Sequence, residues 1–110
     1  MGAALAELGA AVSILDLDAV ACREQVLTLS HGKSTVGIPV QCDLADESST
    51  RNAIREVISG MGGLDILVHC AAYVGTTQVP GWAVPFQEQN IDAWDAALRV
   101  NLTAGFVMVQ

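Results

Sequence analysis

Short apolar runs alternate with helix-forming stretches along this chain, and that alternation is the strongest constraint on its fold. Residues 11–17 (AVSILDL), 36–42 (VGIPVQC) and 64–68 (LDILV) have the length and composition of buried strands. Stretches of helical composition separate them, at 1–8, at 19–29, after Asp46, and from about 91 to the end. Right-handed crossovers place such strands in one parallel sheet. The sequence therefore predicts an α/β fold with a doubly wound parallel sheet.

Local signals predict where these helices begin and end. Gly9 is well placed to stop the first helix, and Asp46 to cap the third. The third helix carries apolar residues at helical spacing and then three glycines: Ala53, Ile54, Val57, Ile58 and Met61, followed by Gly60, Gly62 and Gly63. His31 to Ser34 (HGKS) is predicted as a turn. Pro39 weakens the prediction of a central second strand, because proline has no N–H to donate.

Composition and charge exclude several kinds of partner. The chain has 110 residues, of which 52% are apolar and 15% charged, which suits elements buried on both faces. Its formal charge is −7 without any cluster of Lys and Arg, so neither nucleic acid nor a membrane surface is expected as a partner. No apolar run approaches the roughly 20 residues of a membrane-spanning helix. The absence of a signal-peptide pattern and three separated cysteines (Cys22, Cys42 and Cys70) favour reduced thiols in the cytoplasm.

Asp16 is the first candidate site residue. It stands at the carboxyl end of the first predicted strand. A dinucleotide-binding βαβ unit places an acid there, because two carboxylate oxygens accept both hydrogen bonds from an adenosine ribose. The alternative is that Asp16 and Asp18 only form a polar strand end, and the residues themselves leave both interpretations open.

Asp43 and Leu44 follow the second predicted strand in the same way. Such a pair could border an adenine ring. Asp43 could equally cap the next helix, which is the more common role for an aspartate in that place. On the residues alone, capping is the favoured interpretation.

The third predicted strand is followed by His69, Cys70, Ala71 and Ala72. Small residues allow a backbone to approach a ligand closely, but tight packing of a helix on a sheet needs them too. Adjacent His and Cys residues do not have the spacing of metal ligands. A lone His in such a setting is more often a core residue than a catalyst.

Asn101 is the most unexpected residue of the last predicted helix. It stands in the stretch LRVNLT, and Asn has poor helix propensity because its side chain competes for backbone hydrogen bonds. The helix also carries Trp94, Leu98, Leu102 and Gly105 along one stripe.

Residues 73–90 form a connection long enough to suggest a function, and it follows the carboxyl end of a strand, where open α/β sheets bind ligands. Trp82 lies within it. A Trp ring can stack on a sugar, although packing of the connection onto the sheet is the more common role.

Together these residues resemble the short-chain dehydrogenase/reductase family. The supporting segments are AELGAAVSILDLD, CDLAD, GGLDILVHCAA and WDAALRVNLTAGF, in that order, and they span essentially all 110 residues. The resemblance implies that residues 1–110 are part of an incomplete, Rossmann-like NAD(P)-binding domain. It also implies hydride transfer between NAD(H) and a carbonyl or secondary alcohol of a small molecule. Trp82 makes a sugar one candidate for that molecule.

The resemblance implies roles for individual residues. The acid at Asp16 would bind the adenosine ribose and favour NAD over NADP, because Leu17 offers no positive charge to a 2′-phosphate. Asp43 and Leu44 would border the adenine. Cys70, Ala71 and Ala72 stand where the family's Asn-Asn-Ala-Gly motif lies along the cofactor, and of that motif only Ala71 is matched. Asn101 matches the family's catalytic helix Asn, which distorts the helix and holds a water that passes protons to the active-site Lys.

Two parts of the family pattern are absent from these residues. The glycine-rich phosphate loop is expected just upstream of Met1, and the Tyr-x-x-x-Lys pair beyond Gln110. We therefore expect the chain to be a fragment that is inactive alone and forms a homodimer or homotetramer when complete. The alternatives are a catalytically silent nucleotide-binding or interaction domain, and a doubly wound methyltransferase.

Overall fold

A computed structural model describes residues 1–32, 37–74 and 77–110. Its elements, in chain order, are α1 (Gly2–Glu7), β1 (Ile14–Asp16), α2 (Ala19–Ser30), β2 (Pro39–Gln41), α3 (Glu47–Met61), a 3₁₀ turn η1 (Phe86–Glu88), α4 (Ile91–Leu98), a π turn η2 (Arg99–Thr103) and α5 (Ala104–Val109). This order confirms most of the predicted alternation. The predictions made for Lys33, Ser34, Val36 and Gly75 lie outside the described residues.

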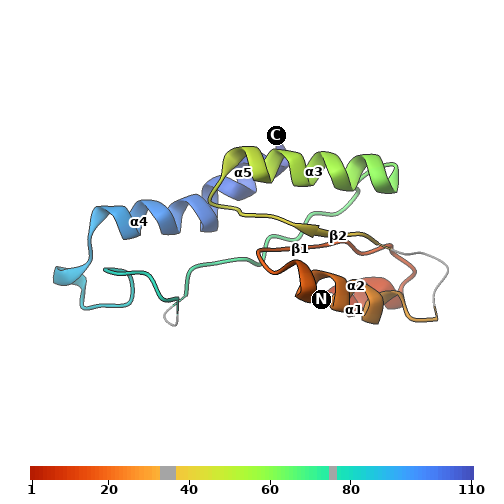
Figure 1. Ribbon diagram of the computed structural model, residues 1–110, viewed down its shortest axis with the longest axis horizontal. Coiled ribbons are helices and arrows are strands. Elements are labelled where there is room, and N and C mark those ends of the chain that lie inside the picture. Colours follow the sequence, from red (N-terminus) through yellow and green to blue (C-terminus); the bar gives the residue numbers. More distant parts are fainter. Residues whose placement is uncertain (33–36, 75–76) are drawn as a thin grey trace.

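Strands β1 and β2 form a parallel pair with helices on both faces. Ile14 lies opposite Pro39, and Asp16 opposite Gln41, so Pro39 is the first residue of its strand. Helix α2 packs against both strands, whereas α3 packs against β2 and α5. Figure 1 shows α1 and α2 on one side of the strands and α3 and α5 on the other. The predicted α/β class with parallel strands is therefore present, as an incomplete sheet.

The prediction of a third strand at 64–68 is wrong for the described part of the chain. Those residues form no helix or strand, and the only paired strands there are β1 and β2. Leu64, Ile66, Leu67 and Val68 are between 37% and 57% exposed. A strand exists only when a neighbouring strand accepts and donates its backbone hydrogen bonds. Apolar composition indicates only that a segment can be buried. It does not show whether a neighbouring strand is there to pair with it.

Side-chain caps begin three of the helices. Asp18 accepts the N–H groups of Val20 and Ala21 at the start of α2, at 2.8 and 3.1 Å. Asp46 accepts the N–H of Ser49 at 2.6 Å and starts α3, as predicted. Asn90 does the same for α4 through Ala93, at 2.8 Å. At the other end of α3, Gly62 has φ +80°, a conformation that glycine adopts without strain.

The core lies between β2 and α3. Its buried members are Val40, Cys42, Ala53 and Val57, with Leu15, Ile38, Leu44 and Met61 packed against them. Ile58, which was predicted on the same face of the helix, is 46% exposed. Thr50 is fully buried, and its hydroxyl donates to the carbonyl of Asp46 at 2.9 Å. This core fixes α3 on the strand that precedes it.

The last helical stretch begins at Ile91 as predicted, but it is not one regular helix, because η2 interrupts it. Its buried residues are three alanines, two valines and a methionine: Ala93, Ala97, Val100, Ala104, Val107 and Met108. Larger apolar side chains form an exposed stripe along it: Ile91, Trp94, Leu98, Leu102, Phe106 and Val109. The radius of gyration is 15.6 Å, above the roughly 13 Å of a compact domain of this length, because α4 and the connection before it project away from the sheet (Figure 1). None of the helices in the described ranges combines the length and apolar composition that crossing a membrane requires.

Candidate functional site

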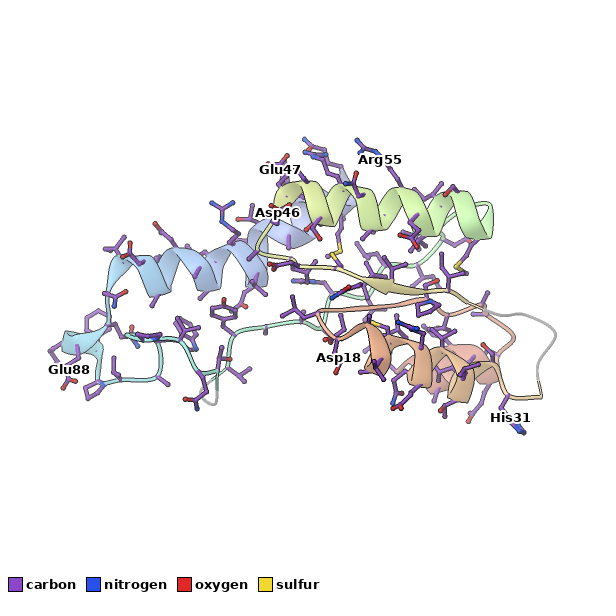
Figure 2. The ribbon with its side chains drawn as sticks, in the orientation of Figure 1. Asp18, His31, Asp46, Glu47, Arg55 and Glu88 are labelled. Atoms are coloured by element: carbon purple, nitrogen blue, oxygen red, sulfur yellow. The ribbon has the colours of Figure 1, made fainter. Side chains whose placement is uncertain are left out.

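The site is built where β1 and β2 end. The N–H of Cys42 donates to the carbonyl of Asp16 at 2.9 Å, and the side-chain amide of Gln41 donates to the carbonyl of Leu17 at 2.9 Å. These bonds hold the two strand ends together beyond the paired residues. Asp18 and Asp46, labelled in Figure 2, follow the two strands at this same end of the sheet.

Asp16 presents a carboxylate at this edge. The residue is exposed, and its Oδ1 accepts the N–H of Asp18 at 3.1 Å. Among the described residues, no hydrogen bond or ion pair engages its second oxygen. The Asp18 carboxylate caps α2. Asp16 and Asp18 therefore have different environments, although both stand at the polar end of the same strand. Asp16 has an acceptor oxygen available to a ligand.

Asp16 takes part in no ion pair within the described residues. The one ion pair found in residues 1–32, 37–74 and 77–110 joins Arg51 to Glu47, at 2.8 Å within α3. Leu17, which follows Asp16, is 65% exposed and apolar. An anionic group placed beside Asp16 would meet a carboxylate that no ion pair neutralises, which is unfavourable.

Asp43 and Leu44 form a tight turn after β2. The N–H of Asp43 donates to the Ser49 hydroxyl at 3.0 Å, and its Oδ1 accepts the N–H of Ala45 at 2.8 Å. Asp46, rather than Asp43, caps α3, so the expectation that Asp43 caps the helix is wrong. The reason is geometric: the Asp43 carboxylate accepts the N–H of Ala45, two residues ahead, and so closes the turn. Leu44 is half-buried against the core and faces a cavity of about 20 Å³, enough for a water molecule.

The segment 69–73 lies against the π turn. Cys70, Ala71 and Ala72 are exposed, whereas the His69 side chain is half-buried, with Nε2 3.0 Å from the carbonyl oxygen of Val100. His69 was expected to be a core residue. Its ring does lie within hydrogen-bond distance of the Val100 carbonyl oxygen, but the residue is only half-buried. The three exposed residues between His69 and Tyr73 are accessible to a ligand.

Asn101 is engaged by the same segment. Its Oδ1 accepts the N–H of Tyr73 at 2.7 Å, and its Nδ2 lies 3.5 Å from the carbonyl oxygen of Tyr73. The side-chain amide therefore pairs with one residue of main chain as a neighbouring strand would. Asn101 also lies inside η2, where the N–H of Ala104 donates to the carbonyl of Arg99 instead of that of Val100. Sequence reasoning selected Asn101 for its poor helix propensity, but nothing in the sequence indicated Tyr73 as its partner.

Trp82 packs within the connection. Its ring lies edge-on to that of Tyr73, with centroids 6.2 Å apart, and its Nε1 donates to the carbonyl of Val74 at 2.9 Å. The hydrogen bonds and the ring contact found for Trp82 are thus with residues of the connection itself. They fix the aromatic pair beside the residue that Asn101 binds.

The cysteines differ in their environment. Burial raises the pKa of the Cys22 thiol, whose sulfur lies 3.5 Å from the carbonyl oxygen of Val40. Burial likewise raises the pKa of the Cys42 thiol. Cys70, in contrast, is exposed. No group of three or more potential metal ligands occurs in the described ranges.

Comparison with known proteins places this geometry in a family. The family model described as enoyl-(acyl carrier protein) reductase matches residues 1–110. An uncharacterized oxidoreductase of Thermotoga maritima is 32% identical over 111 residues, which cover 97% of this chain and 40% of that protein. The D-threitol dehydrogenase of Mycolicibacterium smegmatis is 30% identical over 110 residues, covering 100% of this chain and 39% of that protein.

Solved structures of known proteins also resemble this chain. A mutant of a Serratia marcescens short-chain dehydrogenase/reductase superimposes with a TM-score of 0.82 at 28% identity, covering 99% of this chain and 42% of that one. The chain belongs to the short-chain dehydrogenase/reductase family. An NAD⁺-bound xylitol dehydrogenase (TM-score 0.80, covering 98% of this chain and 39% of that one) shares the fold at 24% identity. A metagenomic short-chain oxidoreductase in complex with NADP (TM-score 0.78, covering 98% and 45%) does so at the same identity.

The chain spans about 40% of the length of these two relatives, which are therefore about two and a half times as long. Such structural neighbours hold either NAD⁺ or NADP. The described residues bring Asp16 together with the Asp43 turn through the Cys42 bond, and Asn101 together with segment 69–73. His69 is the contact residue that sequence reasoning set aside, and no signal in the sequence pointed to its bond with Val100.

Proposed function

We propose that this chain forms the adenosine side of an NAD site in an oxidoreductase that moves hydride between NAD(H) and a carbonyl or secondary alcohol. The observation that carries the proposal is the exposed Asp16 carboxylate at the end of β1, with one oxygen bound to Asp18 and the other available. When bound, the nicotinamide ring of the cofactor supplies the carbon that gives or takes the hydride.

The donor set at this edge fits the adenosine half of NAD. Asp16 would accept from the ribose hydroxyls, in charge-assisted hydrogen bonds stronger than neutral ones. The Asp43–Leu44 turn would border the adenine, with Leu44 anchored in the core and so held in place. Cys70, Ala71 and Ala72, which are exposed, would approach the cofactor through their backbone. A 2′-phosphate would be repelled by Asp16, which favours NAD over NADP.

Asn101 is proposed as the residue of this chain closest to the chemistry. Its side-chain amide is hydrogen-bonded to the main chain of Tyr73, so the side chain would position that segment of backbone rather than the substrate. Its contribution to proton transfer would be made by the main chain of the π turn, where regular helical bonding is interrupted and a water can be held.

A polyol or sugar is the substrate class that we propose to test first. The D-threitol dehydrogenase among the relatives acts on such a compound by its name. In this chain, the Tyr73–Trp82 ring pair stands directly beside the main chain that Asn101 binds. Aromatic faces in that place would pack against the C–H groups of a polyol.

We also propose that the protein works as a homo-oligomer. The stripe of exposed apolar side chains on α4, η2 and α5 is continuous along the helical stretch: Ile91, Trp94, Leu98, Leu102, Phe106 and Val109. A contiguous apolar patch of this kind on a protein surface marks an interaction site. A second copy of the same stripe would cover it in a dimer or a tetramer. Location in the cytoplasm is proposed on the reduced cysteines alone.

The proposal is tested by cofactor titration of the full-length protein, meaning the product of the complete reading frame that contains these residues. Asp16→Ala should weaken NAD⁺ binding by about 1.5–3 kcal/mol, the value of hydrogen bonds to a charged group. Asp18→Ser is the matched control, because serine also caps a helix. It should bind NAD⁺ as the unmutated protein does. Unchanged binding in Asp16→Ala would instead favour the alternative of a silent domain.

A further inference from the structure

The π turn changes which backbone groups pair in the last helical stretch. In a regular α-helix the N–H of Ala104 would donate to the carbonyl of Val100, four residues earlier. Here it donates to the carbonyl of Arg99, five residues earlier. The Val100 carbonyl therefore loses its usual donor at the residue immediately before Asn101.

His69 occupies the place of that donor. Its Nε2 lies 3.0 Å from the Val100 oxygen, a normal hydrogen-bond distance. A carbonyl oxygen only accepts, so the ring must carry its proton on Nε2. The ring also lies over Gly105, where an added Cβ would stand 3.6 Å from its Cδ2, in ordinary contact. The imidazole is thus held on one turn of the helix by a bond and by packing.

Two successive helix residues then hold both ends of one short segment. The Val100 carbonyl oxygen bonds to His69 Nε2, and the Asn101 Oδ1 accepts the N–H of Tyr73 at 2.7 Å. His69 and Tyr73 are four residues apart, and the residues between them are exposed. We propose that His69 is a positioning residue: its Nε2–H replaces the missing helical donor at Val100 and thereby sets where Asn101 meets Tyr73. The proposal rests on the proposed function only for the role of Asn101 in the reaction.

A merely space-filling His69 has different consequences from a hydrogen-bonding one. A space-filling ring would be replaced well by Phe, which is of similar shape and also packs over Gly105. A donor would be replaced well by Gln, whose side-chain N–H reaches about as far as Nε2 and whose shape is different. The pair His69→Phe and His69→Gln therefore separates the two roles.

The test is amide hydrogen exchange at Tyr73 in the full-length protein, followed by NMR. We expect exchange at Tyr73 to be 10-fold or more faster in His69→Phe and restored in His69→Gln, with amides of α3 unchanged in both. In the unmutated protein, the ¹⁵N shifts of the His69 ring should show the proton on Nε2. Unchanged Tyr73 exchange in His69→Phe, no restoration in His69→Gln, or a proton on Nδ1 would each overturn the proposal.

A kinetic readout keeps this result distinct from the cofactor proposal. His69→Phe should lower kcat while leaving the Kd for NAD⁺ within twofold, because the Asp16 edge is not involved. Failure of NAD⁺ to bind the unmutated protein would contradict the proposed function and leave the Tyr73 exchange result standing. Equal loss of NAD⁺ affinity and kcat in His69→Phe would contradict a positioning role.

Discussion

The side-chain amide of Asn101 pairs with the main chain of Tyr73, accepting its N–H at 2.7 Å across 28 residues of sequence. This contact joins a helix to the connection that follows the third apolar run. It explains why a residue with poor helix propensity stands within a helical stretch: the side chain bonds to another segment, while the local helix opens into a π turn.

Removal of the Asn101 side chain should therefore affect turnover more than cofactor binding. In the full-length protein, Asn101→Ala and Asn101→Leu should lower kcat by about 10-fold or more, because loss of the bonds to Tyr73 would release the π turn whose main chain is proposed to hold the water. A lost proton-transfer contact typically costs about 10²–10⁴ in rate. The Kd for NAD⁺ should stay nearly unchanged. Steady-state kinetics with polyols and small alcohols, together with a separate NAD⁺ titration, provide the measurement.

Asn52→Ala is the control for that experiment, because Asn52 is exposed on α3 and its side chain, within the described residues, bonds only to Arg55. It should leave kcat unaltered. If both Asn101 variants also kept full turnover, and gained only the few tenths of a kcal/mol that better helix propensity supplies, Asn101 would have no part in the reaction.

The three cysteines should differ in reactivity. Cys22 and Cys42 are 0% and 2% exposed, and burial raises the pKa of both thiols, so little reactive thiolate forms near neutral pH. Native labelling with iodoacetamide should modify Cys70 alone, and unfolding in urea should expose all three. Mass spectrometry of tryptic peptides reads the sites. Fast labelling of Cys22 in the native protein would contradict the packing of α2 on the strands.

The same pKa shifts predict how stability depends on pH. Both thiols have a higher pKa in the folded protein than in the unfolded chain, so the folded form binds the proton more tightly. The resulting stability is complete below the unfolded thiol pKa of about 8.5 and is lost as the pH rises through the raised folded values. Urea midpoints measured between pH 7 and pH 10 should fall for the unmutated protein and fall less for Cys22→Ala.

Gly37 should not tolerate a side chain. A Cβ at this position would overlap the carbonyl of Val12, because the two backbones approach closely just before the paired strands. Gly37→Ala should cost about 1–3 kcal/mol, as overpacking typically does. Gly63→Ala is the matched control, since no described atom lies within 4 Å of its added Cβ. Comparable urea midpoints for the two variants would contradict this placement of Gly37.

The 110-residue chain produced by itself should be prone to aggregation. Apolar residues of segment 64–68 are exposed and have no strand partner among the described residues, and the stripe on the last helices is exposed too. Ile66→Lys should increase the monomer fraction in size-exclusion chromatography, and Gln87→Lys should not. A soluble monomer of the unmutated chain with a sharp thermal transition would contradict the prediction.

Local features of the fold were predictable from the sequence because their causes are local. Asp46 caps α3 through Ser49, three residues away, and Gly62 ends it through its own backbone freedom. The start of the last helix at Ile91 was likewise predictable. The segment 64–68 was not, because its composition indicates burial while strand formation depends on a distant partner.

The candidate site was predictable only in part for the same reason. Position after a strand singled out Asp16 and Asp43, and poor propensity singled out Asn101. The sequence does not show the backbone angles that decide what each carboxylate binds. These angles leave one Asp16 oxygen available while Asp18 caps α2, and they direct the Asp43 carboxylate to its own turn. The bond between His69 and Val100 joins residues 31 apart in the sequence and exists only because of the π turn.

The central claim is that Asp16 makes this edge of the sheet a site for NAD rather than NADP. Isothermal titration of the unmutated full-length protein with NAD⁺ and with NADP⁺, at one pH and one salt concentration, tests it most directly. The available Asp16 oxygen and the absence of a nearby ion pair among the described residues predict NAD⁺ affinity at least 10-fold above that for NADP⁺. Equal affinities, or tighter binding of NADP⁺, would contradict the role given to Asp16.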